Sequence, residues 1–281
     1  MAIEAFKPEV WSAELLVALE KSLVYGATGI VNRQYEGEIS QYGDTVHIVN
    51  LADPTIGTYT AHTDITIEPV SDADATLLID QSKYFAFEVD DIEKRQARGD
   101  VLGEQARKSA YMLRDVADQH LAGVMAAGVD AGNVIAEQTL ASAADAYDTL
   151  VDLSVRLDED DVPDEGRWAV IPPAFHGLLL KDSRFIAAGD DQGAGVRTNG
   201  MVGSAAGFSL RKSNNAPAGP GVGDGKLVIA GYSGAVTYAE QIANVEGDRM
   251  EKRFADFIKG LHLYGSKVVR PTGLAAADVI I

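Results

Sequence analysis

Five histidines could each bind a transition-metal ion or act as a general base near neutral pH. They stand at positions 47, 62, 120, 176 and 262, and no two have the i, i+4 spacing of a helical His-Glu-x-x-His zinc site. The chain has no cysteine, which excludes disulfides, thiolate nucleophiles and metal sites built from thiolates. We therefore expect the histidines to be structural, with His120 packing or capping within a long helix, and we expect no metal site and no cofactor.

Three glycine-rich segments match catalytic or ligand-binding loops only in part. Gly231-Tyr232-Ser233-Gly234-Ala235 has alanine where the hydrolase nucleophile turn requires its last glycine. Residues 193–198 lack the Gly-Lys-Ser/Thr ending of a phosphate loop, and residues 219–223 lack the strand-to-helix setting of a dinucleotide site. The acidic run at 158–165 lacks the central glycine and the ordered alternation of a calcium loop, which favours a solvated loop.

No combination of nucleophile, base and orienting group emerges from these residues. The sequence therefore predicts a protein that is not an enzyme. A soluble enzyme whose site is dispersed along the sequence is the less favoured alternative.

The charge of the chain argues against a protein that wraps nucleic acid. Its formal net charge is -18, from 42 acidic and 24 basic residues, whereas binding phosphate requires clustered Lys and Arg. A hydrophobic fraction of 46% in 281 residues is typical of soluble globular proteins with a sizeable core. No apolar stretch reaches the roughly 18–20 residues of a membrane span, and the start has no signal-peptide pattern, so a cytoplasmic origin is expected.

The N-terminal third predicts a short helix followed by a long hairpin. Apolar residues at positions 15, 16, 19 and 23 suit an amphipathic helix before Gly29. From residue 30 to about 89, strands are predicted at 45–49, 65–67 and 84–89, with turn formers at 43–44, 53–54, 57 and 72–74. An isolated two-stranded hairpin is only marginally stable in water, so this arm is expected to be stabilised by contact with another structure, such as a neighbouring subunit.

The remainder predicts one long helix and a mixed α/β domain. Asp90 and Glu93 resemble a capping box, and apolar or small residues at steps of three or four predict a helix over 101–129, about 43 Å long. A Gly/Ala-rich joint then leads to predicted helices at 146–157 and 174–180 around a buried strand at 168–171. Further strands are predicted at 208–211, 226–230, 236–239 and 257–270, and surface loops at 187–207 and 216–225.

This order of elements resembles the tailed-phage major capsid (coat) proteins with the Hong Kong 97-like fold, which is an α+β fold. Similar local sequences lie along nearly the whole chain: Gly43-Asp44-Thr45-Val46, Phe87-Glu88-Val89-Asp90-Asp91, residues 168–180, residues 200–208 followed by Ser213-Asn214-Asn215, residues 259–265, and Val268-Val269-Arg270-Pro271. The resemblance implies an N-terminal arm at 1–29, an extended β-hairpin loop at 30–89, a peripheral domain with its spine helix at 90–142, an axial domain at 143–235, and return strands at 236–281.

The same resemblance implies a function in assembly. Copies would form the hexamers and pentamers of an icosahedral shell around double-stranded DNA, without sequence-specific binding to that DNA. The implied partners are identical subunits, a separate scaffolding protein, a portal protein and a decoration protein, and no membrane. The implied location is the virion capsid, assembled in the host cytoplasm. An encapsulin, a cellular nanocompartment shell of the same fold, is the main alternative.

Within the hairpin, Tyr59, His62 and Asp64 near the presumed tip are candidates for contacts between subunits. Some relatives join their subunits through an isopeptide bond from a hairpin lysine. No lysine occurs between Lys21 and Lys83, so the sequence predicts no such bond from this hairpin.

Overall fold

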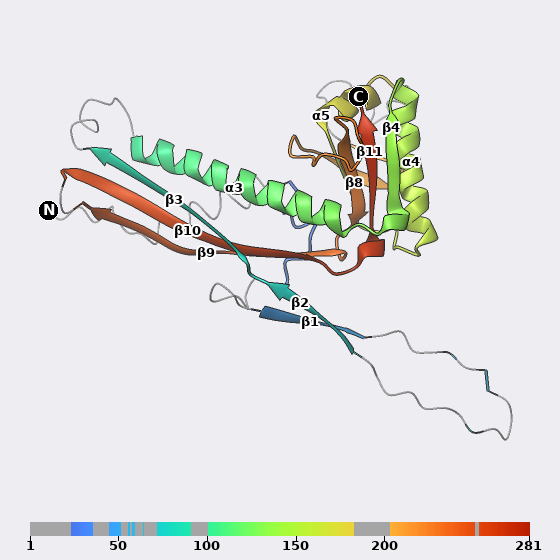
Figure 1. Cartoon of the computed structure of the whole chain (residues 1–281), viewed down its shortest axis with the longest axis horizontal. Helices are drawn as coiled ribbons and strands as arrows, with labels where there is room; N and C mark the ends of the chain where they lie inside the picture. The colour runs from blue at the N-terminus through green and yellow to red at the C-terminus, as the bar shows by residue number, and fades with distance from the viewer. Residues whose placement is uncertain are drawn as a thin grey trace.

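The computed structural model describes residues 24–35, 45–51, 56, 58–59, 64, 72–90, 101–182, 203–250 and 253–281. Within these ranges the chain forms an antiparallel hairpin stem, a three-stranded sheet under one long helix, and a six-stranded sheet with two shorter helices (Figure 1). Four predicted features lie wholly or mostly outside the described residues: the helix before Gly29, Glu93 of the capping-box pair, the strand at 65–67, and the loop at 187–207.

The hairpin stem consists of β1 (Thr45–Leu51) and β2 (Asp72–Leu78), paired from Thr45 opposite Leu78 to Leu51 opposite Asp72. This confirms the predicted strand at 45–49 and the antiparallel arm. The prediction of a turn at 72–74 was wrong, because those residues begin β2. Antiparallel pairing with Val49 and Leu51 of β1 overrides the turn preference of the two aspartates.

The strand predicted at 84–89 exists as β3 (Gln81–Asp90), but it does not pair with the hairpin stem. It pairs with β10 (Ala255–Val268), which also pairs with β9 (Val236–Arg249), giving the sheet order β3-β10-β9. β9 extends ten residues beyond its predicted end at Ala239. The aromatic residues Phe85 and Phe87 explain the position of β3, because they pack toward the long helix.

The long helix α3 (Val101–Gly128) confirms the prediction for 101–129 and spans about 42 Å at 1.5 Å per residue. It lies along the three-stranded sheet in Figure 1. Its N-terminal half packs Ala106, Ala110 and Leu113 against Phe85 and Phe87. Its C-terminal half contributes Ala117, Leu121 and Met125 to a second core. One apolar stripe therefore serves two sheets.

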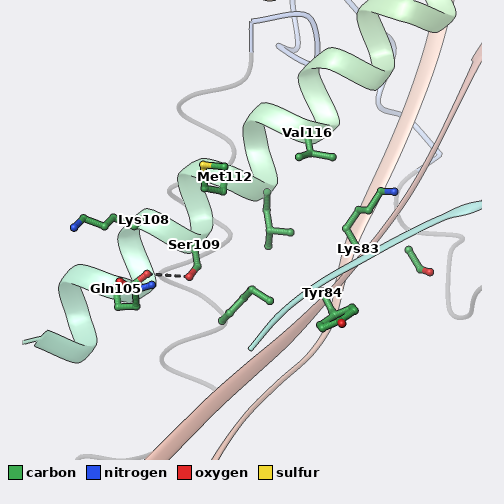
Figure 2. A pocket seen from close by; sticks show the side chains of 10 residues that line it. Lys83, Tyr84, Gln105, Lys108, Ser109, Met112 and Val116 are labelled. Atoms are coloured by element: carbon green, nitrogen blue, oxygen red, sulfur yellow. Dashed lines mark hydrogen bonds between the residues drawn. The ribbon is translucent and has the colours of Figure 1, made fainter. Parts of the chain in front are cut away.

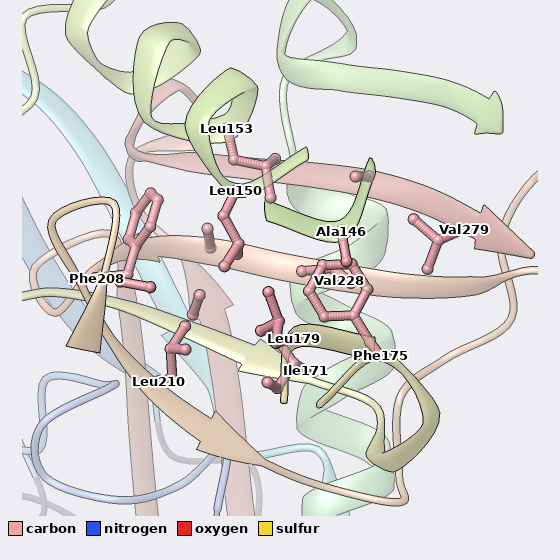
Figure 3. Packing of buried hydrophobic residues seen from close by; sticks show 14 of the residues in the cluster. Ala146, Leu150, Leu153, Ile171, Phe175, Leu179, Phe208, Leu210, Val228 and Val279 are labelled. Atoms are coloured by element: carbon pink, nitrogen blue, oxygen red, sulfur yellow. The ribbon is translucent and has the colours of Figure 1, made fainter. Parts of the chain in front are cut away.

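The six-stranded sheet has the order β4-β11-β8-β5-β7-β6. Its strands are β4 (Val134–Thr139), β5 (Arg167–Ile171), β6 (Ser204–Ala205), β7 (Phe208–Lys212), β8 (Lys226–Tyr232) and β11 (Leu274–Ile280). Helices α4 (Ala143–Glu159) and α5 (Pro173–Leu179) pack on one face, where Figure 3 shows Leu150, Leu153 and Phe175 meeting Ile171 and Val228. Short 3-10 turns at Ala131–Asn133 and Pro271–Gly273 precede β4 and β11.

β4, β6 and β11 were not predicted, and β6 lies in the segment 187–207 that was predicted to be a loop. Both helices and the strands at 168–171, 208–211, 226–230 and 257–270 were confirmed. β11 reads Leu-Ala-Ala-Ala-Asp-Val-Ile, and alanine and aspartate have low β propensity. It is a strand because it lies between β4 and β8 with six of its seven residues buried. Position in the sheet therefore outweighs local preference.

The hairpin stem and β10 approach each other at Gly265. A Cβ at this position would overlap the Leu78 carbonyl oxygen and come within 2.9 Å of Ile79 Cδ1. Leu77 and Ile79 form a small core with Ala239 and Leu263 at this crossing. The glycine therefore sets how closely the base of the arm can pack on the sheet.

We predict that Gly265→Ala lowers the free energy of unfolding by about 1–3 kcal/mol, because the backbone of Leu78 cannot move aside without disturbing the crossing. Gly123→Ala is the matched control. A Cβ at Gly123 meets no atom within 4 Å, and alanine is the better helix former, so this variant should gain about 0.5–1 kcal/mol. Urea unfolding of both variants measures the difference, and equal stabilities would contradict the close approach.

Candidate functional site

Asp118 on α3 anchors the segment that precedes the hairpin. Its Oδ1 accepts hydrogen bonds from the backbone N–H groups of Val24 (3.0 Å) and Tyr25 (2.8 Å), and its Oδ2 accepts one from Asn215 Nδ2 (3.1 Å). Asn215 also donates to Asp115 Oδ1 at 2.9 Å. Burial raises the pKa of Asp118, and these hydrogen bonds oppose that rise. One carboxylate thus joins the N-terminal segment, the helix and the loop after β7.

A second anchor is the buried carboxylate of Glu240 on β9, whose side chain is 2% exposed. Its Oε1 forms an ion pair with Arg33, and its Oε2 accepts from the Tyr238 hydroxyl at 2.8 Å. His262 Nε2 on β10 lies 3.2 Å from the same Oε2. The Arg33 guanidinium also lies over the Tyr238 ring, 5.5 Å from its centroid. This network fixes the N-terminal segment to the three-stranded sheet.

The pKa values of this network follow from burial and hydrogen bonding. Burial by itself would raise the pKa of Glu240, but the hydrogen bond from His262, the charges of Arg33 and His262 and the hydrogen bond from Tyr238 together lower it. Burial and the neighbouring Glu240 charge raise the pKa of Tyr238 well above its ordinary value. Burial, with the charge of Asp80, raises the pKa of Tyr264 to about 12. Glu240 is therefore ionised near neutral pH and both phenols are neutral.

An open groove runs between α3 and β3, with a volume of about 500 Å³. Figure 2 shows Met112 and Val116 on the helix and Tyr84 on the strand among its lining side chains. Ser109 donates to the Gln105 carbonyl at 2.9 Å, which leaves its hydroxyl turned to its own helix. Aromatic and aliphatic side chains supply half of the lining, and polar residues, among them two lysines, supply the other half: Ser82, Lys83, Tyr84, Phe85, Gln105, Lys108, Ser109, Met112, Leu113 and Val116.

Several large apolar side chains at this groove are exposed in the single chain. Tyr84 is 79% exposed, Met112 59% and Val116 38%. Gly260 on β10 lies directly under the Phe85 ring, where a Cβ would clash, so the ring can lie flat on the sheet. A contiguous exposed apolar surface next to lysines is typical of a surface that another protein covers. Sequence reasoning missed this groove, although Met112 and Val116 form a second apolar row at i, i+4 on the helix.

The structure does not bring the predicted hairpin residues into a site within the chain. Tyr59 is 69% exposed, Asp64 is also exposed, and His62 lies outside the described residues. Their role in contacts between subunits stays a prediction. The histidines at 120 and 262 pack against the Tyr264 ring, at centroid distances of 5.5 and 5.0 Å, which agrees with the packing role expected for His120.

The other motifs of the sequence have structural roles in the described residues. Tyr232 to Ala235 form a turn between β8 and β9, closed by the Ala235 N–H donating to the Tyr232 carbonyl. In the acidic run, the carboxylates of Asp158 and Asp164 are 55% and 93% exposed and pair with the buried guanidinium of Arg167 at 2.6 and 3.0 Å. The described residues contain no group of three or more acidic or histidine side chains placed to hold a metal ion. Among the described helices, none is both long enough and apolar enough to span a membrane.

Comparison with known proteins identifies the family. A family model described as "Phage capsid protein" matches residues 74–277. A solved structure from Mycobacterium phage Che8 is 31% identical, with 91% of each chain covered and a TM-score of 0.75. The chain belongs to the phage capsid protein family. A search of curated proteins found no match.

Other solved structures share the Hong Kong 97-like fold of this capsid protein at low identity. The capsid of Cyanophage P-SCSP1u is 16% identical, with 92% of this chain and 88% of that chain covered and a TM-score of 0.72. An encapsulin from Synechococcus elongatus is 12% identical, with 85% and 83% covered and a TM-score of 0.55. The fold is therefore common to capsids and encapsulins, and the encapsulin match is the weaker one. The protein is a major capsid protein, a structural subunit of the virion shell that assembles from identical copies.

We predict that Glu240→Gln lowers the free energy of unfolding at neutral pH by about 3 kcal/mol, because Arg33 loses the charge that compensates it. The folded-state pKa of Glu240 lies below its ordinary value of 4.5, so the stability that its charge contributes is complete above 4.5 and is lost as the pH falls through the lowered value. Denaturant unfolding between about pH 3 and 7 should show that the difference in free energy of unfolding between the wild type and Glu240→Gln becomes smaller as the pH falls. Glu159→Gln, on the exposed end of α4, is the control. A difference in stability between the wild type and Glu240→Gln that does not change with pH would contradict the role given to the Glu240 charge.

Proposed function

We propose that this capsid protein forms the hexamers and pentamers of an icosahedral shell around double-stranded phage DNA, and that it acts by surface contact without catalysis. The observation that carries the proposal is the family match over 74–277. The net charge of -18 supports a shell that contains DNA without binding its sequence, since clustered basic residues are what phosphate binding requires. A separate scaffolding protein, a portal protein, a decoration protein and assembly in the host cytoplasm belong to the same proposal.

The proposed division of labour follows the predicted domains: an N-terminal arm at 1–29, an extended loop beginning at 30, a peripheral domain around α3, an axial domain over 143–235, and return strands from 236. The six-stranded sheet with α4 and α5 supports a compact axial domain, which also takes β4 from before residue 143 and β11 from the return strands. The three-stranded sheet supports a peripheral domain that takes β3 from the end of the loop region and β9 and β10 from the return strands.

We propose that the hairpin of one subunit lies in the groove between α3 and β3 of the next. Charge supports this pairing, because residues 34–82 include nine acidic residues and no Lys or Arg, whereas the groove lining has two lysines and no acidic residue. Burial supports it as well, since Ile56 at 94% exposure and Tyr59 at 69% would be covered by such a contact. The contact candidates Tyr59, His62 and Asp64 would then act from the tip of the arm.

Negative-stain electron microscopy of the purified recombinant protein, alone and co-expressed with its neighbouring genes, tests the shell proposal. Closed shells, or sheets and tubes of capsomers, are the expected result. A uniform population of monomers or dimers in every condition would overturn it and favour the enzyme alternative. Neighbouring portal and terminase genes would support the phage shell, and a neighbouring gene for a cargo enzyme would support the encapsulin.

We predict that Met112→Glu blocks assembly while the subunit stays folded, because it places an acidic group in a groove that receives an acidic hairpin. Deleting Gly57 to Asp64 removes the other side of the contact. The subunits should stay soluble, and the yield of assembled particles should fall at least about tenfold, as expected for the loss of roughly 1.4 kcal/mol per contact. Val155→Glu on α4 is the matched control, because Val155 is also exposed, at 46%, but lies outside the groove. Sedimentation of assembled particles gives the yield, and normal shells from either groove or hairpin variant would refute the docking.

A further inference from the structure

β3 is an edge strand whose outer side is open. Among the described strands it pairs with β10 alone, in an antiparallel register without any shift from Gln81 to Asp90. Its ten residues contain no proline and no glycine. A long edge strand without such breaks presents its unpaired N–H and C=O groups to any strand that lies beside it. β3 is therefore a surface to which another chain can add a strand.

The opposite edge of the same sheet is less open. At the start of β9, the Tyr238 N–H donates to the Asn32 carbonyl at 3.0 Å, and the Asn32 N–H donates to the Val236 carbonyl at 2.8 Å. The register between β9 and β10 also shifts between Leu261 and His262, and an irregularity of this kind protects an edge from pairing with a new strand. Of the two edges, β3 is therefore the one that suits a partner strand.

The groove beside α3 lies along the open edge of β3. Four consecutive residues of the strand, at positions 82–85, line the groove, although successive side chains of a strand point to opposite faces of its sheet. Figure 2 shows Lys83 and Tyr84 on opposite sides of the strand. A hollow bordered by both sets of side chains lies beside the strand and not over one face. The main chain of β3 therefore forms part of the groove wall.

A second hollow, of about 380 Å³, lies on the other face of the sheet. Its lining comes from all three strands: Tyr84, Ala86, Glu246, Lys259, Gly260 and Leu261. Ala86 alternates with Phe85 and Phe87, which pack toward α3, so this hollow faces away from the helix. Tyr84, which is 79% exposed, lines both hollows. The two hollows therefore meet across the edge of β3.

We propose that a strand of the hairpin of a second copy pairs with the outer edge of β3 and extends the three-stranded sheet by one strand. The inference rests on the hairpin docking proposed above and adds main-chain pairing to that contact. Strand addition of this kind takes its affinity from main-chain hydrogen bonds and its specificity from pockets for alternate side chains. Alternate side chains of the added strand enter the groove beside α3, and the others enter the hollow next to Leu261.

The hairpin suits this edge by its shape and its charge. In the described residues its stem is a two-stranded ladder, so each stem strand has an edge free for further pairing. Residues 34–82 include nine acidic residues and no Lys or Arg, whereas lysine lines both hollows, with Lys83 and Lys108 in one and Lys259 in the other. Lys259 is paired with Glu246 at 2.6 Å, so the groove beside α3 offers the stronger attraction for acidic side chains.

Hydrogen exchange of the full-length recombinant protein tests the pairing, with free subunits compared against shells assembled from this protein alone. In the shells, every second amide of β3 should exchange at least about tenfold more slowly, the effect of roughly 1.4 kcal/mol of stabilisation, because alternate N–H groups point to the outer edge. Amides of the hairpin should gain a matching protection. The amides of β8, which has a neighbouring strand on each side, are the control and should be protected in both states.

Proline at two adjacent positions of β3 provides a second test. Tyr84 and Phe85 stand opposite Leu261 and Gly260, and in an antiparallel pair only one of two successive residues bonds to the partner strand. Compared with alanine at the same position, Tyr84→Pro or Phe85→Pro should lower the free energy of unfolding of the subunit, whichever removes the bond to β10. The other proline should leave subunit stability nearly unchanged and lower the shell yield at least about tenfold.

Shells in which the β3 amides exchange as fast as in free subunits would overturn the pairing and leave shell formation itself intact. Protection of β3 without any gain in the hairpin would mean that another segment, such as β3 of a second copy, occupies the edge, and would equally overturn the proposal. So would normal shells from both proline variants. A wild type that forms no shells would contradict the proposed function, and the strand addition that rests on it would fall with it.

Discussion

The burial of a single helix on two different surfaces is the constraint on which the fold depends. The N-terminal half of α3 covers the aromatic face of the three-stranded sheet, and its C-terminal half completes the core that contains Trp168, Ile229 and Tyr264. A helix of 28 residues can do this because its apolar stripe keeps one face inward over about 42 Å. The two sheets are therefore joined through one rigid element, which a subunit of a curved shell requires if its parts are to keep their relative positions.

Buried polar groups fix the segment that precedes the hairpin to this frame. Asp118 holds the backbone of Val24 and Tyr25, and Glu240 holds Arg33, so the segment leading into the hairpin is fastened at two points. Each carboxylate is almost completely bonded, which is the condition under which burial of a charge is tolerated. Asn215 explains one of the similar local sequences, because its amide bridges Asp115 and Asp118 on the helix.

The exposed apolar groups of the single chain are consistent with a subunit whose apolar surfaces are covered only when it contacts identical copies. The hairpin stem is a two-stranded ladder, a structure that is marginal alone, and the groove between α3 and β3 exposes Tyr84 and Met112. A protein of this family has identical neighbours to cover such surfaces. The proposed contacts between copies would supply the apolar burial that the isolated chain lacks.

The sequence by itself determined the elements whose patterns are local: the helix at 101–129, the helices at 146–157 and 174–180, the buried strand at 168–171, and the first strand of the hairpin at 45–49. Their apolar periodicity and flanking turn residues act within a few residues of one another, and their order along the chain indicated the family. Tertiary structure alone decided that alanine-rich β11 is a strand, that Asp72 and Asp74 pair in β2, and that β3 leaves the hairpin for β10. It also placed Arg33, Glu240 and His262 in one network. These outcomes depend on which separate segments of the chain lie next to each other, and a residue's own type does not specify that partner.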